Sequence, residues 1–114
     1  MQQTDGLIRG ATVTDTGEAI SVDEMSMGMA ARNTVRDALG VGLYCNDRSM
    51  CMFEDNTVVG TRADAAGIRT RRGIAVLTGF QSEANLWQNR LVANPVDETA
   101  ITNSTIRNTS HAAW

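Results

Sequence analysis

A short phrase that recurs along the chain constrains its fold more than any other feature. Each copy contains a polar residue, Asn, a small or polar residue and a branched aliphatic residue. The clear copies begin at Arg32, Asp55 and Gln88, and weaker copies begin at Gly10 and Asn103. The aliphatic positions are 13, 35, 58, 91 and 106, so the successive spacings are 22, 23, 33 and 15. A period near 22 with one insertion of about ten residues indicates a solenoid, in which each coil buries its apolar side by stacking on its neighbours.

Aligning the copies on the Asn predicts three strands per coil. Apolar residues recur at the thirteenth and eleventh positions before the Asn, with small or polar residues between them, and this period-two alternation is typical of a strand with one buried face. A second strand precedes the Asn directly, and a third holds the aliphatic residue. The aligned sets are Ile20, Leu43 and Val76; Val22, Cys45 and Thr78; Gly28, Cys51 and Ala84; Ala30, Phe53 and Leu86; and Val35, Val58 and Leu91. They predict an all-β parallel β-helix with stacked strands about 4.8 Å apart.

The repeated Asn is predicted to lie in the turn between the second and third strands. Asn tolerates left-handed backbone angles, and stacked side-chain amides can hydrogen-bond to one another as a ladder. Ala11 and Ser104 take the place of the Asn in the weaker copies. The ladder is therefore expected to stop at both ends.

One segment also fits a different structure. Ser21 to Glu24 form a capping-box sequence, and the spacing of the following apolar residues up to Gly40 would suit an amphipathic helix over 22–39 and an α+β domain. The strand prediction is preferred, because the same offsets hold in two other coils that have no helix signal.

Composition excludes several classes of protein. A chain of 114 residues forms one domain at most. Its net charge of -3 offers no electrostatic footprint for nucleic acid. No apolar run approaches the roughly 18 residues of a membrane helix, and no signal peptide is visible. The two cysteines, Cys45 and Cys51, could bridge across a turn or lie as separate buried thiols, and buried thiols are preferred.

Two coils resemble repeats of the right-handed parallel β-helix superfamily, the pectate-lyase-like proteins. They run from Gly40 to Thr61 and from Gly73 to Asn94, each with the pattern Gly-aliphatic-x-aliphatic followed by Asn-x-aliphatic. The repeat itself predicts four to five coils with the period near 22 inside 1–109, an insertion at 63–72 and a tail at 110–114. The resemblance covers about residues 8–108 and implies the right-handed parallel β-helix fold. It also implies an extracellular or periplasmic protein. The catalytic motifs of the polygalacturonases and alginate epimerases are missing, so no catalytic residue is carried over.

An acidic cluster is the first candidate site. The alignment stacks Asp23 under Asn46 and Glu24 under Asp47, about 5 Å apart. Such carboxylates could hold Ca²⁺ or act as an acid/base couple. The preferred interpretation is that they form turns at strand ends, with no metal or cofactor bound.

An arginine cluster in and beside the insertion is the second candidate. It comprises Arg62, Arg69, Arg71 and Arg72, and Arg48 is expected nearby. Guanidinium groups bind carboxylates bidentately, so an acidic polysaccharide is the expected ligand. A solvated loop is the preferred interpretation.

Three further features complete the candidates. Trp87 is predicted to face outward, where it could stack on a sugar or cover a neighbouring surface. The methionines at alternate positions between Met25 and Met52 are predicted to pack in stacked pairs rather than to bind metal. His111, the only histidine, has no catalytic partner in view.

The expected function is a non-catalytic β-helix module that binds carbohydrate or serves as a structural or interaction segment. The alternative is a fragment of a lyase or hydrolase that acts on uronate polysaccharides, with Asp23, Glu24, Asp47 and an Arg from 62–72 at the site. Uncapped coil ends favour a homo-oligomer or a longer chain.

Overall fold

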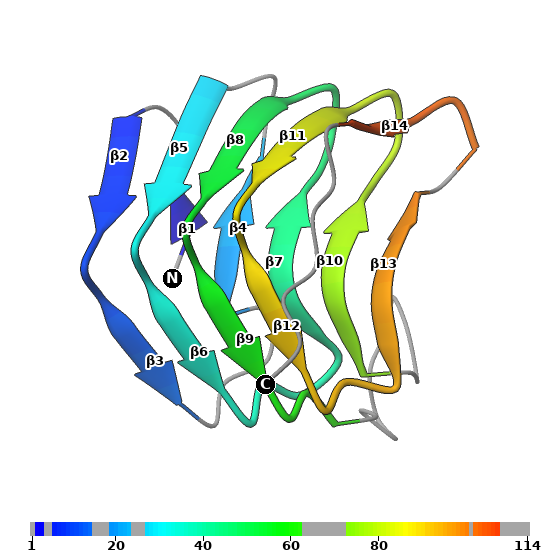
Figure 1. Ribbon diagram of the computed structural model, residues 1–114. Coiled ribbons are helices and arrows are strands. Elements are labelled where there is room, and N and C mark those ends of the chain that lie inside the picture. Colours follow the sequence, from blue (N-terminus) through cyan, green and yellow to red (C-terminus); the bar gives the residue numbers. More distant parts are fainter. Residues whose placement is uncertain are drawn as a thin grey trace.

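The computed structural model describes residues 2–3, 6–14, 19–23, 27–62, 73–100 and 102–107. These residues form fourteen strands and no helix. The strands belong to three parallel sheets, here called A, B and C, and the chain passes through the sheets in that order (Figure 1). Neighbouring strands of a sheet are one circuit of the chain apart, so the arrangement is compatible with a parallel β-helix.

The bounds of the strands show the repeat directly. Sheet A contains β1 (Gln2–Gln3), β4 (Ile20–Val22), β7 (Val41–Cys45), β10 (Ile74–Thr78) and β13 (Val96–Ala100). Sheet B contains β2 (Gly6–Arg9), β5 (Met27–Ala31), β8 (Met50–Glu54), β11 (Glu83–Trp87) and β14 (Thr105–Arg107). Sheet C contains β3 (Thr12–Thr14), β6 (Thr34–Arg36), β9 (Thr57–Val59) and β12 (Arg90–Val92).

The register of these sheets confirms the predicted sets. Leu43 pairs with Ile20 and Val76 in sheet A. Phe53 pairs with Ala30 and Leu86 in sheet B, and the third set pairs likewise in sheet C. Within 27–39 the chain forms β5 and β6, so the helical alternative is wrong there; its residues 24–26 lie outside the described part. The segment forms strands and not a helix because β5 and β6 each pair with an equivalent strand on both sides.

The phrase that begins at Asn103 is not a fifth copy. β14 pairs with β11 of sheet B, and Ile106 is in register with Ala84 rather than with Leu91. The step from Leu91 to Ile106 is shorter than a coil, and it brings the chain only from sheet C through sheet A to sheet B. Ser104 therefore does not occupy the Asn position.

The predicted Asn ladder is present in the corner between sheets B and C. Asn33, Asn56 and Asn89 are buried. The Nδ2 of Asn33 donates to Oδ1 of Asn56, and the Nδ2 of Asn56 donates to Oδ1 of Asn89, each at 3.0 Å. The ladder stops at Ala11, whose backbone N–H donates to Oδ1 of Asn33 at 2.9 Å.

The sequence predicts left-handed backbone angles at the Asn of this corner. In the structure the residue before the Asn adopts them instead. Its φ is 68° at Gly10, 56° at Arg32, 58° at Asp55 and 54° at Gln88. The following Asn side chain lies in the interior. There its Nδ2 also donates to a backbone carbonyl of the preceding coil, at Ile8, Ala30 or Phe53. The Asn is selected by these buried backbone groups, because unpaired polar groups in the interior are costly.

Sheet A departs from simple alternation. Val41, Tyr44, Ile74 and Leu77 form a hydrophobic cluster of their own, separate from the main core. Gly42 faces the main core instead, because a Cβ on it would lie 2.7 Å from Cγ1 of Val58. Two successive residues of β7, Gly42 and Leu43, therefore face inward, and Ala75 and Val76 on β10 likewise both belong to the main core. Both faces of sheet A are buried at β7 and β10.

The predicted insertion at 63–72 and the tail at 110–114 lie outside the described residues. The chain on either side of the insertion meets at Gly40, whose N–H donates to the Arg62 carbonyl and whose carbonyl accepts from the Ile74 N–H, both at 2.7 Å. None of the described segments is a helix with the length and apolar character that a membrane span requires.

Candidate functional site

The acidic candidates lie at the corner where β4 and β7 end. Oδ1 of Asp23 accepts a hydrogen bond from Nδ2 of Asn46 at 2.9 Å, and its Oδ2 accepts one from Oγ of Ser21 at 3.3 Å. Asp47 has a left-handed φ of 54° and forms an exposed ion pair with Arg48 at 3.8 Å. Asp23 thus stacks on Asn46 as predicted. Glu24 lies outside the described residues.

Arg62, the one member of the predicted arginine cluster within the described residues, is not at this corner. Arg62 lies beside Gly40, before β7 begins, and its Nη2 donates to the Asp37 carbonyl at 3.2 Å. Five residues of extended strand, about 16 Å, separate it from the end of β7. The expectation that Arg48 lies near Arg62 is wrong, because the two residues flank opposite ends of this strand.

The other candidate arginines, Arg69, Arg71 and Arg72, lie outside the described residues. Within the described ranges, no group of three or more His, Cys, Asp or Glu side chains lies close enough to hold a metal ion. The calcium and uronate-lyase hypotheses therefore stay predictions.

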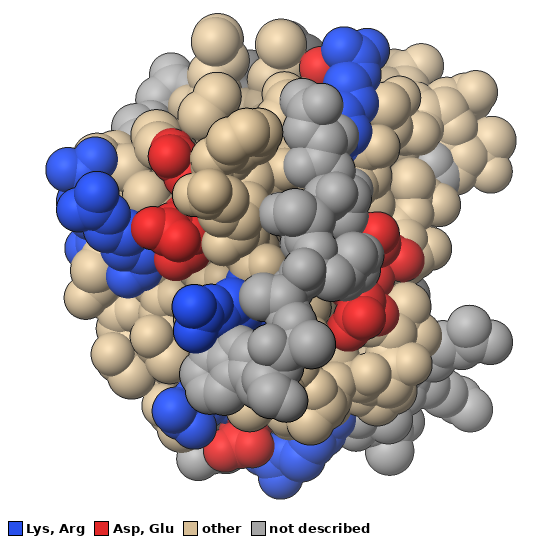
Figure 2. Space-filling view, in the orientation of Figure 1, with Lys and Arg blue, Asp and Glu red and all other residues tan. Residues whose placement is uncertain are grey.

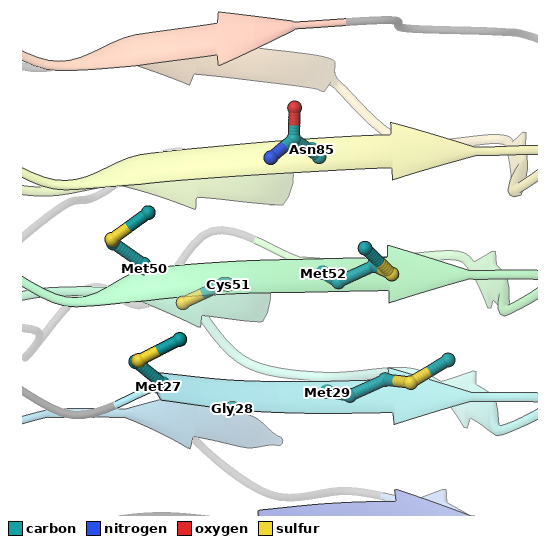
Figure 3. A pocket seen from close by; sticks show the side chains of 7 residues that line it. All are labelled: Met27, Gly28, Met29, Met50, Cys51, Met52 and Asn85. Atoms are coloured by element: carbon teal, nitrogen blue, oxygen red, sulfur yellow. The ribbon is translucent and has the colours of Figure 1, made fainter.

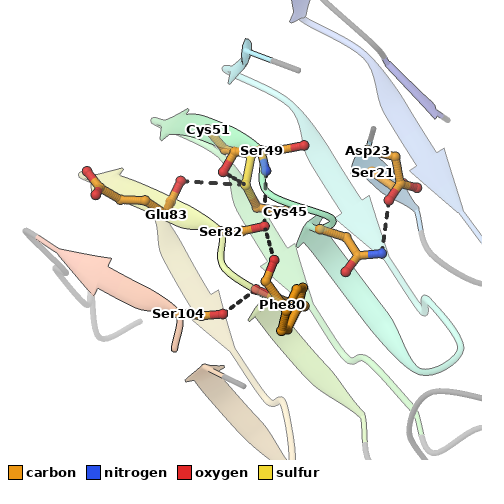
Figure 4. Close-up of a disulfide and its surroundings, with 11 residues drawn as sticks. Ser21, Asp23, Cys45, Ser49, Cys51, Phe80, Ser82, Glu83 and Ser104 are labelled. Atoms are coloured by element: carbon orange, nitrogen blue, oxygen red, sulfur yellow. Dashed lines mark hydrogen bonds between the residues drawn. A yellow bond between two sulfur atoms is a disulfide. The ribbon is translucent and has the colours of Figure 1, made fainter. Parts of the chain in front are cut away.

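Cys45 and Cys51 form a disulfide, so the preference for free buried thiols is wrong (Figure 4). Cys45 ends β7 and Cys51 lies in β8, and both side chains face the core across the corner between sheets A and B. Their Cα atoms are 6.1 Å apart. Sγ of Cys45 also lies 3.6 Å from the Ser49 carbonyl and 3.5 Å from that of Glu83. These are S···O contacts, since a disulfide sulfur has no proton to donate.

The outer face of sheet B carries a stacked set of methionines. The sequence predicted that these methionines pack in pairs. Met27 is in register with Met50, and Met29 with Met52, as predicted. Met27, Met50 and Met52 are, however, 66%, 54% and 46% exposed. The alternate residues of β5 and β8 face the core, so the methionines necessarily face out. The inward residues are Gly28, Ala30, Cys51 and Phe53. We call Met27, Met29, Met50 and Met52 the methionine face.

A shallow hollow lies on this face. The four methionines line it together with Gly28, Cys51 and Asn85, as Figure 3 shows. Met27 and Met50 stand at one end of the hollow, and Met29 and Met52 stand at the other. Leu7, which is 48% exposed, pairs with Met29 and extends the same row to β2.

A second hollow adjoins the first around Trp87. This side chain is 55% exposed, which confirms that it faces outward. Glu54 is in register with Trp87 on the neighbouring strand, and Asn85 lies two positions before it on the same face. Both residues line the hollow with Met52 and Leu86. Sequence reasoning missed Glu54 and Asn85, although their spacing from the aligned positions places them on the same side as Trp87.

Charges of both signs are interspersed on the face shown in Figure 2, so no field of one sign covers it. Farther along sheet B, Nη2 of Arg107 forms an ion pair with Oε2 of Glu83 at 3.2 Å. No known protein-family model and no solved structure matches this chain.

Proposed function

We propose that this chain is a right-handed parallel β-helix of four to five coils, similar to the pectate-lyase-like proteins, that binds carbohydrate without catalysing a reaction. The three parallel sheets, the coil period near 22 and the Asn ladder support the fold. The binding surface is the part of sheet B around Trp87.

The observation that carries this proposal is the exposed indole of Trp87 between a carboxylate and an amide. One face of a sugar ring is apolar and can pack on an indole, which has a large apolar body. The Glu54 carboxylate accepts from sugar hydroxyls, and the Asn85 amide both donates and accepts. Each such hydrogen bond adds about 0.5–1.5 kcal/mol. Association costs translational and rotational freedom, so these few contacts give weak binding that is useful only when several modules bind together.

The charge of Glu54 selects between classes of sugar. A uronate would place its own carboxylate close to that of Glu54, and the like charges would repel each other. The site around Trp87 therefore favours neutral sugars over uronates. This preference separates it from the lyase hypothesis, which requires an acidic polysaccharide.

The ends of the coil stack support self-association. Among the described residues, sheet C ends at β3 on one side and at β12 on the other. Outer strands of a sheet present backbone groups that can pair with another chain. We propose that copies associate through these strands. The disulfide supports an extracellular or periplasmic location, because such bonds persist in oxidising compartments.

A binding experiment tests the proposed function. The protein is titrated by NMR or isothermal calorimetry with neutral and uronate oligosaccharides, with and without Ca²⁺. We expect weak binding of a neutral sugar, lost in Trp87→Ala and retained in the control Phe80→Ala, which truncates another exposed aromatic residue outside the hollow around Trp87. Absence of binding to every sugar, or binding that survives Trp87→Ala, would contradict the proposal. Appearance of unsaturated uronate products that is lost in Glu24→Ala and Asp47→Ala would instead establish the lyase.

A further inference from the structure

The methionine face presents four thioether sulfurs around one hollow. Met27 and Met50 are opposite each other on β5 and β8, and so are Met29 and Met52. Neighbouring strands lie about 4.8 Å apart, and alternate residues along a strand are about 6.6 Å apart. The four side chains therefore leave the backbone at the corners of a small rectangle, and the hollow between the two pairs is lined by all of them (Figure 3).

Core packing does not account for these side chains, because three of the four are about half exposed or more. Leu or a charged residue would serve equally well on an exposed strand. What distinguishes Met is its polarizable sulfur on a chain with three rotatable bonds. Two in-register pairs on adjacent strands place this same chemistry at four neighbouring positions.

Thioether sulfur is a soft, neutral ligand that selects Cu(I), whereas Mg²⁺ and Ca²⁺ require oxygen ligands. Taking the zinc–thiolate bond of about 2.3 Å as a guide to the scale, two sulfurs on one ion stand about 4 Å apart. That separation is close to the spacing of adjacent strands. Met side chains can close the remaining gap by rotation, without movement of the backbone.

We propose that the methionine face binds one soft monovalent cation, Cu(I) or its redox-inert analogue Ag(I), through the thioethers of Met27, Met29, Met50 and Met52. The ion lies in the hollow between the two methionine pairs. This site is separate from the carbohydrate contacts of Trp87, although Met52 borders both hollows.

Neighbouring acidic groups suit a cation at this position. Glu54 follows Met52 by two positions on the same face of β8, and Glu83 is in register with Met50 on β11. Glu83 is also paired with Arg107, so Glu54 supplies the greater part of the local negative charge. The ligands themselves are uncharged, so the complex keeps a single positive charge that Glu54 balances.

Thioethers have no proton to lose, which gives the site a distinctive pH dependence. Sites built from thiolate, imidazole or carboxylate lose affinity as these ligands are protonated. Binding through the four methionines is expected to stay nearly constant between pH 5 and 8.

The test is a calorimetric titration of the intact, disulfide-bonded protein with Ag⁺ in chloride-free nitrate buffer. We expect one Ag⁺ per chain, with affinity lowered at least tenfold by Met27→Leu with Met50→Leu, and likewise by Met29→Leu with Met52→Leu. The fourfold Leu variant should lose measurable binding. His111→Ala and Trp87→Ala should bind as the unaltered chain does, and the Trp87 variant separates this site from the carbohydrate site.

Two readouts decide the outcome. X-ray absorption at the silver edge should show a first shell of sulfur only, and circular dichroism should show that the fourfold Leu variant keeps its fold. Undiminished Ag⁺ affinity in that variant, or a first shell of nitrogen or oxygen, would overturn the proposal. A tenfold or greater loss of affinity between pH 8 and pH 5 would also overturn it.

Discussion

The outer face of sheet A carries a buried apolar cluster on β7 and β10, whereas that of sheet B carries exposed methionines among polar residues. Val41, Tyr44, Ile74 and Leu77 on sheet A are 1–5% exposed, and they pack together with Val96. The equivalent outward positions of sheet B carry methionines that are about half exposed. An apolar outward position can therefore serve stability or binding, and burial distinguishes the two. Sheet A contributes to the core, whereas sheet B offers its surface to a ligand.

The largest expected effect is the loss of stability on truncating Leu77 on sheet A, and truncating Met50 on sheet B gives the comparison. Leu77→Ala removes a buried side chain and should lower the free energy of unfolding by about 2–5 kcal/mol. Met50→Ala removes a half-exposed side chain and should lower it by about 1 kcal/mol or less. Urea denaturation of both variants gives the comparison. Equal losses would show that the two faces are equally buried.

The disulfide joins the end of β7 in sheet A to β8 in sheet B, and its removal tests how far the corner between the two sheets depends on it. Replacing Cys45 and Cys51 together by Ser should lower the free energy of unfolding by about 2 kcal/mol, as expected for a short closed loop. Thermal unfolding of the variant, with the unaltered protein before and after reduction as control, measures the effect. A variant as stable as the unaltered protein would show that the corner is held by its hydrogen bonds alone.

The smallest expected effect is that of methionine oxidation on stability. Dilute peroxide should convert Met27, Met50 and Met52 to sulfoxides in the folded protein, because these side chains are accessible. A sulfoxide at an exposed position is hydrated, so the free energy of unfolding should change by about 0.5 kcal/mol or less. Peptide mass spectrometry and urea denaturation measure the two quantities. Loss of the folded state upon oxidation would contradict an exposed methionine face.

The sequence predicted the parts of the fold that depend on equal spacing. Strand sets such as Ile20, Leu43 and Val76 were predictable, because stacking requires identical offsets in successive coils. The Asn ladder followed from the same offsets. The prediction of a further copy at Asn103 was wrong. So short a pattern can recur by chance, and the spacing to this copy is shorter than one coil.

Other features could not be predicted from spacing. Alternation placed the methionines and Trp87 on common faces, but it does not say whether another part of the chain covers a face. Coverage of a face depends on contacts between segments far apart in sequence. Tyr44 and Met50 both occupy outward positions of a strand, and the sequence pattern does not show that the first is covered and the second is not. The disulfide could not be predicted either, because it depends on how the chain turns between Cys45 and Cys51.

The most direct test of the central claim is hydroxyl-radical footprinting of the folded protein, with the unfolded chain as reference. Met27, Met50, Met52 and Trp87 should react at nearly their unfolded rates, whereas Tyr44 and Leu77 should react on the order of ten times more slowly, because burial protects them until the structure opens. Similar protection of Tyr44 and Met50 would contradict the account, since the outer faces of the two sheets would then be equally covered or equally open.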